Sequence, residues 1–530
     1  MNGLIPSDHP DGPAPAVRHG AVLVVTCLAL ATVVSAMASL NVALPDIARD
    51  THADQTQLSW IIDAYSLIFA ALLLLAATLG DRFGRRKALL GGLATFAGVS
   101  LAATFTTDPI VLIVLRGVLG VAAAFIMPAT LSTITSTFPR SQQARAVSIW
   151  AAVAGASAVL GLLASGAALE LWSWRSVFWL NVVLAGVALI GTHRFVPESA
   201  QPDSRRVDVV GAVLTVLGLG VLVFSVIQAP EHGWASPRTL VGIAAGLVVL
   251  GVFVAWELRH PHPLLDPRLF RRMPFAAGSL SITLQFFAFF GFIFVVMQYL
   301  QLVRGDSALV AAVSVLPMSA AMIPSARLSP RLVARRGARG PWCVGLLLVA
   351  TGLFVMARLD ADSSYWLLVT GLVPLGAGMG LAMAPATAAI TDALPPHLQN
   401  VGSAVNDLSR ELGGALGIAV LGSVLSAGYR SHLDVGAVPA PVADAARSSL
   451  AAAAHAGEAT GNLSLVDQAR DAFASGMHLA MVSGAATAVL AAVVVALLLR
   501  RTAKSHTVAD HRQVDATADD AAGRAARSAR

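Results

Sequence analysis

Long runs of apolar residues recur along the whole chain, and short polar connections separate them. A membrane-spanning helix needs about 20 mainly apolar residues, because about 30 Å of hydrocarbon is crossed at about 1.5 Å per residue. Fourteen runs approach or exceed this length, so the pattern predicts an all-α integral membrane protein with 14 transmembrane helices. The predicted spans cover residues 20–44, 58–80, 88–105, 109–132, 145–169, 174–192, 208–228, 238–256, 274–300, 308–326, 340–357, 365–390, 402–426 and 475–499.

Lys and Arg residues are distributed unevenly between the connections. The connections after the second, sixth, eighth and tenth spans are rich in them, whereas the short connections after odd-numbered spans carry at most one each. Positive residues collect on the cytoplasmic side of a membrane. We therefore expect a bacterial inner-membrane protein with both termini in the cytoplasm.

Composition agrees with a protein whose main partner is the lipid bilayer. The chain is 56% hydrophobic and 12% charged, whereas soluble domains carry about a quarter charged residues. The basic residues lie in short loops. This distribution indicates the orientation of a membrane protein and does not indicate nucleic-acid binding. Cys27 and Cys343 fall inside apolar runs without a ligand spacing, so we expect no metal and no cofactor.

A weak internal repeat divides the chain into two halves. Residues 127–130 read Met-Pro-Ala-Thr and residues 384–387 read Ala-Pro-Ala-Thr, and each Pro is followed eleven residues later by another. Two six-helix bundles separated by two inserted helices follow from this repeat. The predicted parts are a cytoplasmic tail (1–19), a first bundle (20–192), an insert (193–273), a second bundle (274–500) with an outer loop of short helices (427–474), and a disordered cytoplasmic tail (501–530).

Several segments resemble motifs of one transporter family. The connection after the second span reads Leu-Gly-Asp-Arg-Phe-Gly-Arg-Arg-Lys (79–87) and resembles the cytoplasmic signature loop of the major facilitator superfamily. Residues 116–120, which begin with Arg116, resemble the intramembrane arginine motif of that family, and residues 406–414 resemble its branch with fourteen helices. The loop residues that the resemblance marks for the conformational switch are Asp81, Arg82, Gly84, Arg85 and Arg86.

This resemblance implies a drug/proton antiporter of that fold, with a 6 + 2 + 6 arrangement of helices. It would export amphipathic small molecules in exchange for protons, and it would act as a monomer. Asn41 belongs to a motif of the same branch and is a candidate for the substrate cavity. Ala36 and Leu162 replace an acid and a proline that the family pattern often has. Either the coupling runs through other acids or the protein is not a proton antiporter.

Two charged residues of the first half are predicted to lie at matching depth in the membrane. Asp63 is about 8 Å from the outer end of the second span, and Arg116 is about 10 Å from the outer end of the fourth. Charged groups are costly inside a bilayer and therefore mark functional sites. We predict that the two form an ion pair that a proton or a cationic substrate breaks; the alternative is a structural arginine and an acid that reaches the interface.

The thirteenth span contains a second charged cluster. Asp407, Arg410 and Glu411 are spaced so that Asp407 shares a helical face with both others. One carboxylate can pair with the arginine while the other carries protons. The alternative is a neutralised structural cluster near the inner interface.

The ninth span is rich in aromatic residues. Phe287, Phe290 and Phe294 share a face, and Gln285 and Gln298 flank them. An aromatic wall with a few polar groups suits an amphipathic ligand; a lipid-facing aromatic helix is the alternative. Spans 5 and 13 are rich in Gly, Ala and Ser, which predicts close helix packing.

Secondary active export is the predicted function. Import or facilitated diffusion of a small solute is the alternative within transport. A membrane-embedded enzyme or a sensor is disfavoured, because the sequence has no His-Glu-x-x-His motif, nucleophile elbow or phosphate-binding loop.

Overall fold

The computed structural model describes residues 19–199, 208–261, 263–394, 399–435 and 438–528, and within these ranges the regular structure is helical. The predicted tail 1–19 lies almost wholly outside the described residues. The elements are α1 (His19–Thr51), α2 (Gln55–Phe83), α3 (Arg85–Ala103), α4 (Pro109–Thr137), α5 (Arg140–Leu171), α6 (Arg175–Phe195), α7 (Val209–His232), α8 (Pro237–Glu257), η1 (Pro267–Arg271), α9 (Met273–Gln298), η2 (Tyr299–Val303), α10 (Ala308–Ser314), α11 (Leu316–Arg336), α12 (Arg339–Met356), α13 (Tyr365–Asp392), α14 (Gln399–His432), α15 (Ala440–Ser448), α16 (Leu450–Thr460) and α17 (Leu463–Ser528).

Twelve helical segments of the described residues are long and apolar enough to cross a membrane. They include α10 and α11 together as one span, and α9 together with the π-helix η2. Helices α3 and α5, which hold the third and fifth predicted spans, are not among them, although α5 carries the apolar stretch Ala156–Leu171. The fold is therefore an all-helical membrane bundle with twelve candidate spans, and the number fourteen stays a prediction.

Local sequence signals explain where several helices begin. Asp54 caps α2, where its side chain accepts from the Gln57 amide while the Gln57 side chain accepts from the Asp54 amide. Asp108 caps α4 in front of Pro109, and Ser236 caps α8. Such caps satisfy amide groups that have no partner within the helix.

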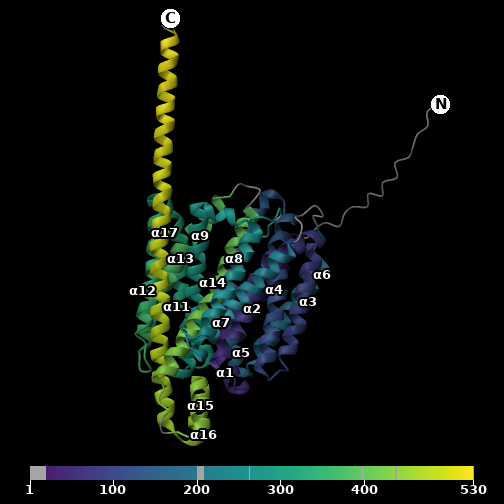
Figure 1. Ribbon diagram of the computed structural model, residues 1–530. Coiled ribbons are helices and arrows are strands. Elements are labelled where there is room, and N and C mark those ends of the chain that lie inside the picture. The colour runs from purple at the N-terminus through teal and green to yellow at the C-terminus, as the bar shows by residue number, and fades with distance from the viewer. Residues whose placement is uncertain (1–18, 200–207, 262, 395–398, 436–437, 529–530) are drawn as a thin grey trace, which may run out of the picture.

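The helices pack into two sets that meet along α2 and α14 (Figure 1). In the first set α1 packs on α4, α5 and α6, and α4 packs on α2 and α3. In the second set α9 packs on α13, α14 and α17, while α12 and α13 pack on each other. Helices α7 and α8 pair with each other, and α7 contacts both α2 and α14.

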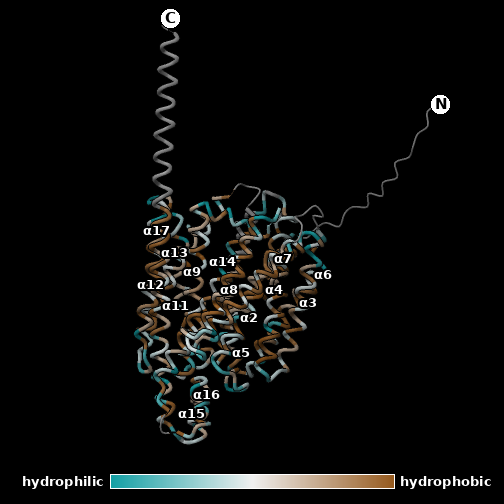
Figure 2. The backbone as a smooth tube through the Cα atoms, viewed as in Figure 1, coloured by the Kyte–Doolittle hydropathy of each residue, from teal (hydrophilic) through white to brown (hydrophobic). Residues whose placement is uncertain are grey.

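Hydrophobic residues make up most of the length of the bundle's helices, and hydrophilic residues gather towards its two ends (Figure 2). Helix α8 is the most exposed of the candidate spans, with Val241 and Val248 each about two-thirds exposed. An apolar surface of this kind suits contact with lipid.

Small residues allow the predicted close packing. A Cβ on Gly161 of α5 would lie 2.8 Å from the Cα atom of Ser35 in α1. A Cβ on Gly417 of α14 would clash with the backbone oxygen of Phe287 in α9. Larger side chains at these two glycines would separate the helices.

The long connection after α14 contains α15 and α16 at one end of the bundle (Figure 1). We call this end the α15–α16 end. The residues predicted as a disordered tail continue α17 as a helix up to Ser528. This stretch is rich in alanine, which has the highest intrinsic helix propensity.

Candidate functional site

Arg116 of α4 is buried against α2. Its Nε–H donates to the Ile61 carbonyl oxygen at 2.8 Å, and its guanidinium carbon lies 4.4 Å from the centre of the Tyr65 ring. Tyr65 in turn donates from its hydroxyl to the Val33 carbonyl in α1 at 3.1 Å. Arg116 therefore links α4 to α2, and Tyr65 extends the link to α1.

Asp63 of α2 has an exposed fraction of 0%. Neither of its carboxylate oxygens has a hydrogen-bond partner. A charged carboxylate without partners is costly to bury, so this residue is the least satisfied acid of the first half that the structure describes.

The predicted ion pair between Asp63 and Arg116 is absent from the structure. Arg116 uses Ile61 and Tyr65, each two residues from Asp63 and hence about 200° away around the helix axis. Asp63 shares the opposite face with Ser59 and Leu67. Equal depth along the two spans therefore did not predict in which direction around its helix each side chain lies.

That opposite face of α2 meets α14. A Cβ on Gly422 of α14 would lie 3.1 Å from the Ser59 hydroxyl oxygen. Leu67 belongs to an apolar cluster that contains Ala419 of α14 and residues of α7. Asp63 lies between these two points of contact, at the seam where the two helix sets meet.

The cluster in α14 is only partly paired. Arg410 lies 3.9 Å from Asp407, and its guanidinium carbon lies 4.7 Å from the centre of the Phe286 ring in α9. Glu411 is buried, and its Oε2 has no hydrogen-bond partner.

The aromatic face of α9 packs against α14. Cβ atoms on Gly414 and Gly422 would lie 2.8 and 3.0 Å from the rings of Phe290 and Phe294. Phe287 and Phe294 are buried. The lipid-facing alternative is therefore wrong for these residues, and their role in a substrate cavity stays a prediction.

Three amide side chains that were predicted to face substrate are buried and bond their own helices. Asn41 donates to the Met37 and Ala38 carbonyls, Gln285 to Ser281, and Gln298 to the Phe294 carbonyl. The oxygens of Asn41 and Gln285 have no partner. Both can accept a hydrogen bond from a ligand that reaches them.

The signature loop is tied to the end of α6. Arg85 pairs with Asp81 at 2.7 Å, and Arg86 donates to the His193 carbonyl at 2.7 Å. Gly84 has φ +118°, and a Cβ there would lie 2.6 Å from a carboxylate oxygen of Glu198. The guanidinium carbon of Arg82 lies 5.5 Å from the centre of the Phe83 ring. The loop is therefore a packed junction between α2, α3 and the end of α6.

Two residues that join helices escaped sequence reasoning. Tyr65 stands two positions after Asp63. It is uncharged, so the search for charged residues inside the predicted spans did not select it. Gln301 donates to the Val42 carbonyl at 2.9 Å and joins η2 to α1. The π-helical turn η2 directs the Gln301 side chain towards α1, and the hydrophobic pattern of the sequence does not predict such a turn.

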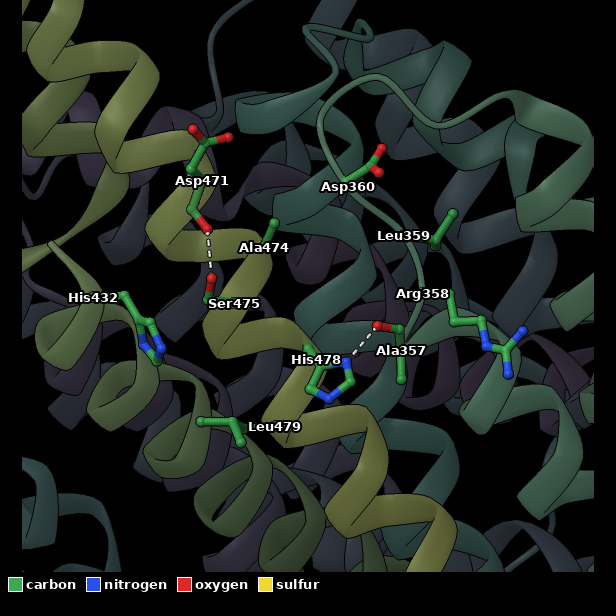
Figure 3. Close-up of a pocket in the computed structure, with 10 residues that line it drawn as sticks. All are labelled: Ala357, Arg358, Leu359, Asp360, His432, Asp471, Ala474, Ser475, His478 and Leu479. Atoms are coloured by element: carbon green, nitrogen blue, oxygen red, sulfur yellow. Dashed lines mark hydrogen bonds between the residues drawn. The ribbon is translucent and has the colours of Figure 1, made fainter.

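A separate cavity of about 540 Å³ opens at the α15–α16 end between α12, α14 and α17 (Figure 3). It is lined by His432, Asp471, His478 and Arg358 among others. The Nδ1 atom of His478 lies 2.8 Å from the Ala357 carbonyl oxygen. None of the predicted site residues lines this cavity.

A bundle of apolar helices in two sets, with charged groups buried at the seam between them, defines a membrane transporter. The Major Facilitator Superfamily model matches residues 26–418, and the chain belongs to this family. The protein is thus a multi-pass membrane transporter and not an enzyme.

Curated relatives cover most of the chain. The Multidrug resistance protein Stp of Mycobacterium tuberculosis is 36% identical over 408 residues, which are 76% of each chain. The Multidrug efflux pump LfrA of Mycolicibacterium smegmatis is 36% identical over 87% of this chain and 92% of its own. The Tetracenomycin C resistance and export protein of Streptomyces glaucescens is 34% identical over 79% of each chain.

Solved structures share the fold. The chain resembles a bacterial homolog of the human lysosomal transporter Spinster, in an inward-facing and occupied conformation, with a TM-score of 0.62 and 19% identity over 92% of this chain and 98% of that one. A proton dependent oligopeptide transporter matches with a TM-score of 0.62 and 13% identity over 92% and 100% of the two chains. At these identities the likeness concerns the fold alone.

Proposed function

We propose that the protein exports amphipathic drugs or antibiotics across the bacterial inner membrane by proton antiport with alternating access. Relatives named for multidrug efflux, multidrug resistance and antibiotic export support the direction and the substrate class. The observation that carries the coupling is Asp63, a partnerless acid enclosed where α2 meets α14.

The full architecture in this proposal has fourteen transmembrane helices. Helix α3 packs on α4 and α6, and α5 packs on α1 and on α10, so both lie within the bundle beside candidate spans. Adding them gives the fourteen-helix branch, with α7 and α8 as the insert between two six-helix bundles. The basic signature loop then faces the cytoplasm together with both termini, and the α15–α16 end faces outward.

The conformation described by the structure is closed at the α15–α16 end. The Leu309 amide of α10 donates to Glu170 of α5 at 3.3 Å, and Gln301 donates to Val42. A Cβ on Gly166 of α5 would lie 2.9 Å from the Cα atom of Leu309. These contacts join the two helix sets near this end, so substrate enters from the opposite, cytoplasmic end in this state.

Asp63 couples closure to protons in this proposal. Closing the outer end places Asp63 between α2 and α14, where a charged carboxylate has no partner. Protonation from the outside removes that charge and permits closure. The proton-loaded protein then returns to the cytoplasmic side without drug, which is the return step of an antiporter.

The α14 cluster completes the path. Asp407 and Glu411 stand on either side of Arg410 in sequence, and Glu411 is a second buried acid with an unpartnered oxygen. We propose that these acids release the proton inward when a cationic drug binds. Asn41, Gln285 and the α9 aromatic residues would line the drug path.

Accumulation of ethidium in cells with and without the protein tests the direction of transport. Expressing cells should accumulate less dye, and a protonophore should abolish the difference. Faster accumulation in expressing cells would instead support import of a small solute. Cells expressing Asp63→Asn at matched levels in the membrane serve as a control for the presence of the protein.

A further inference from the structure

Helix α7 fills the outer part of the seam between α2 and α14. One apolar cluster combines residues of all three helices, and two of the three belong to different halves of the bundle. It comprises Leu67 and Ala71 of α2, Leu219, Val223, Val226 and Ile227 of α7, and Ala419 of α14. The rings of Trp60 in α2 and Phe224 in α7 lie 6.0 Å apart.

Polar contacts join α7 to the same two helices near the α15–α16 end. Glu231, in the last turn of α7, accepts a hydrogen bond from the Thr56 hydroxyl of α2 at 2.8 Å. The same Oε1 atom lies 3.8 Å from Arg430 of α14. One turn earlier, Ser423 of α14 donates to the Val226 carbonyl at 2.8 Å.

Nearby charged groups have other assignments. Asp54 caps α2 and acts electrostatically with both Glu231 and Arg430. Arg238 of α8 contacts His232 at 2.7 Å. Within the described part of the chain, Glu231 thus contacts one residue of the first half, Thr56, and one of the second half, Arg430.

We propose that α7 acts as a strap, meaning a helix that packs on both α2 and α14 and so bridges the seam. Glu231 is the positioning residue that holds α2 and α14 together in the state closed at the α15–α16 end. The proposal rests on alternating access as the proposed mechanism. Opening this end separates α2 from α14, so the strap must leave one of them. The apolar cluster supplies most of the adhesion, and Glu231 sets where the end of α7 docks.

Distance measurements between the two halves test the strap. Spin labels at Thr107→Cys and Ser364→Cys, both exposed at the α15–α16 end, report the separation in purified protein that also carries Cys27→Ala and Cys343→Ala. Glu231→Gln and Arg430→Gln should each raise the open-to-closed ratio about two- to fivefold, the range for a partly exposed ion pair. The swap of Glu231→Arg with Arg430→Glu should restore the original ratio.

Arg238→Gln is the matched control, because it removes a charge from the same insert without touching α2 or α14. Thr56→Val serves where a charge variant folds poorly, and it should shift the ratio in the same direction. An unchanged distance distribution in Glu231→Gln and Thr56→Val would overturn the strap. The measurement needs neither drug nor a pH gradient, so its outcome is independent of whether ethidium is exported.

Discussion

Arg116 is satisfied by backbone and by an aromatic ring instead of by an acid. Its Nε–H bonds the Ile61 carbonyl, and its planar guanidinium lies over Tyr65. A guanidinium can stack and donate sideways at the same time, whereas an ammonium is a point charge. The residue therefore holds α4 on α2 irrespective of the protonation of Asp63.

This geometry predicts that Arg116→Lys destabilises the protein by about 1–3 kcal/mol, because the buried cation loses its hydrogen bond to the Ile61 carbonyl and its stacking on Tyr65. Tyr65→Phe should cost about 1 kcal/mol through the lost bond to Val33. Thermal unfolding in detergent measures both. Arg358→Lys is the control, since Arg358 lies over the exposed Phe354 ring, and its melting temperature should stay unchanged. Equal stability of Arg116→Lys and the parent protein would contradict this role.

Helices α9 and α14 show how elements are brought together by small residues. Three glycines of α14 face the backbone or the rings of α9, namely Gly413, Gly414 and Gly417. A Cβ added to any of them would clash with atoms of α9. The sequence predicted close packing of the glycine-rich span from composition alone. Composition does not indicate which neighbouring helix the span packs on. For this reason the sequence offered only a substrate cavity or lipid as surroundings for the aromatic residues of α9, whereas they face α14.

The interface predicts that Gly417→Leu reduces the yield of folded protein and lowers the unfolding temperature, because overpacking against backbone costs about 1–3 kcal/mol or more. Gly186→Leu is the matched control, since a Cβ on Gly186 of α6 meets nothing within 4 Å. Size-exclusion profiles and melting curves of the two variants give the comparison. A monodisperse Gly417→Leu protein with parental stability would disprove close packing at this site.

At the scale of the whole molecule, hydropathy predicted where the long helices lie along the chain, while the orientation taken from loop charge stays a prediction. The predicted spans coincide with helices throughout, because apolar length is a one-dimensional property that the bilayer imposes. The twelve candidate spans leave out α3 and α5, whose sequences are short or less apolar. Direction around a helix depends on its neighbours, which is why Asp63 and Arg116 were paired wrongly and why Gln301 and the α7 strap were missed.

In the proposed mechanism a proton on Asp63 drives drug export. This can be measured in proteoliposomes with an imposed pH gradient and ethidium, with wild type, Asp63→Asn and the exposed acid variant Asp362→Asn compared in one assay. Wild type and Asp362→Asn should move ethidium against its gradient when the pH gradient is applied. Asp63→Asn should lose this uphill transport about tenfold or more while it keeps downhill exchange, since a permanently neutral side chain permits closure without a proton. Uphill transport of ethidium by Asp63→Asn at the wild-type rate would contradict the account.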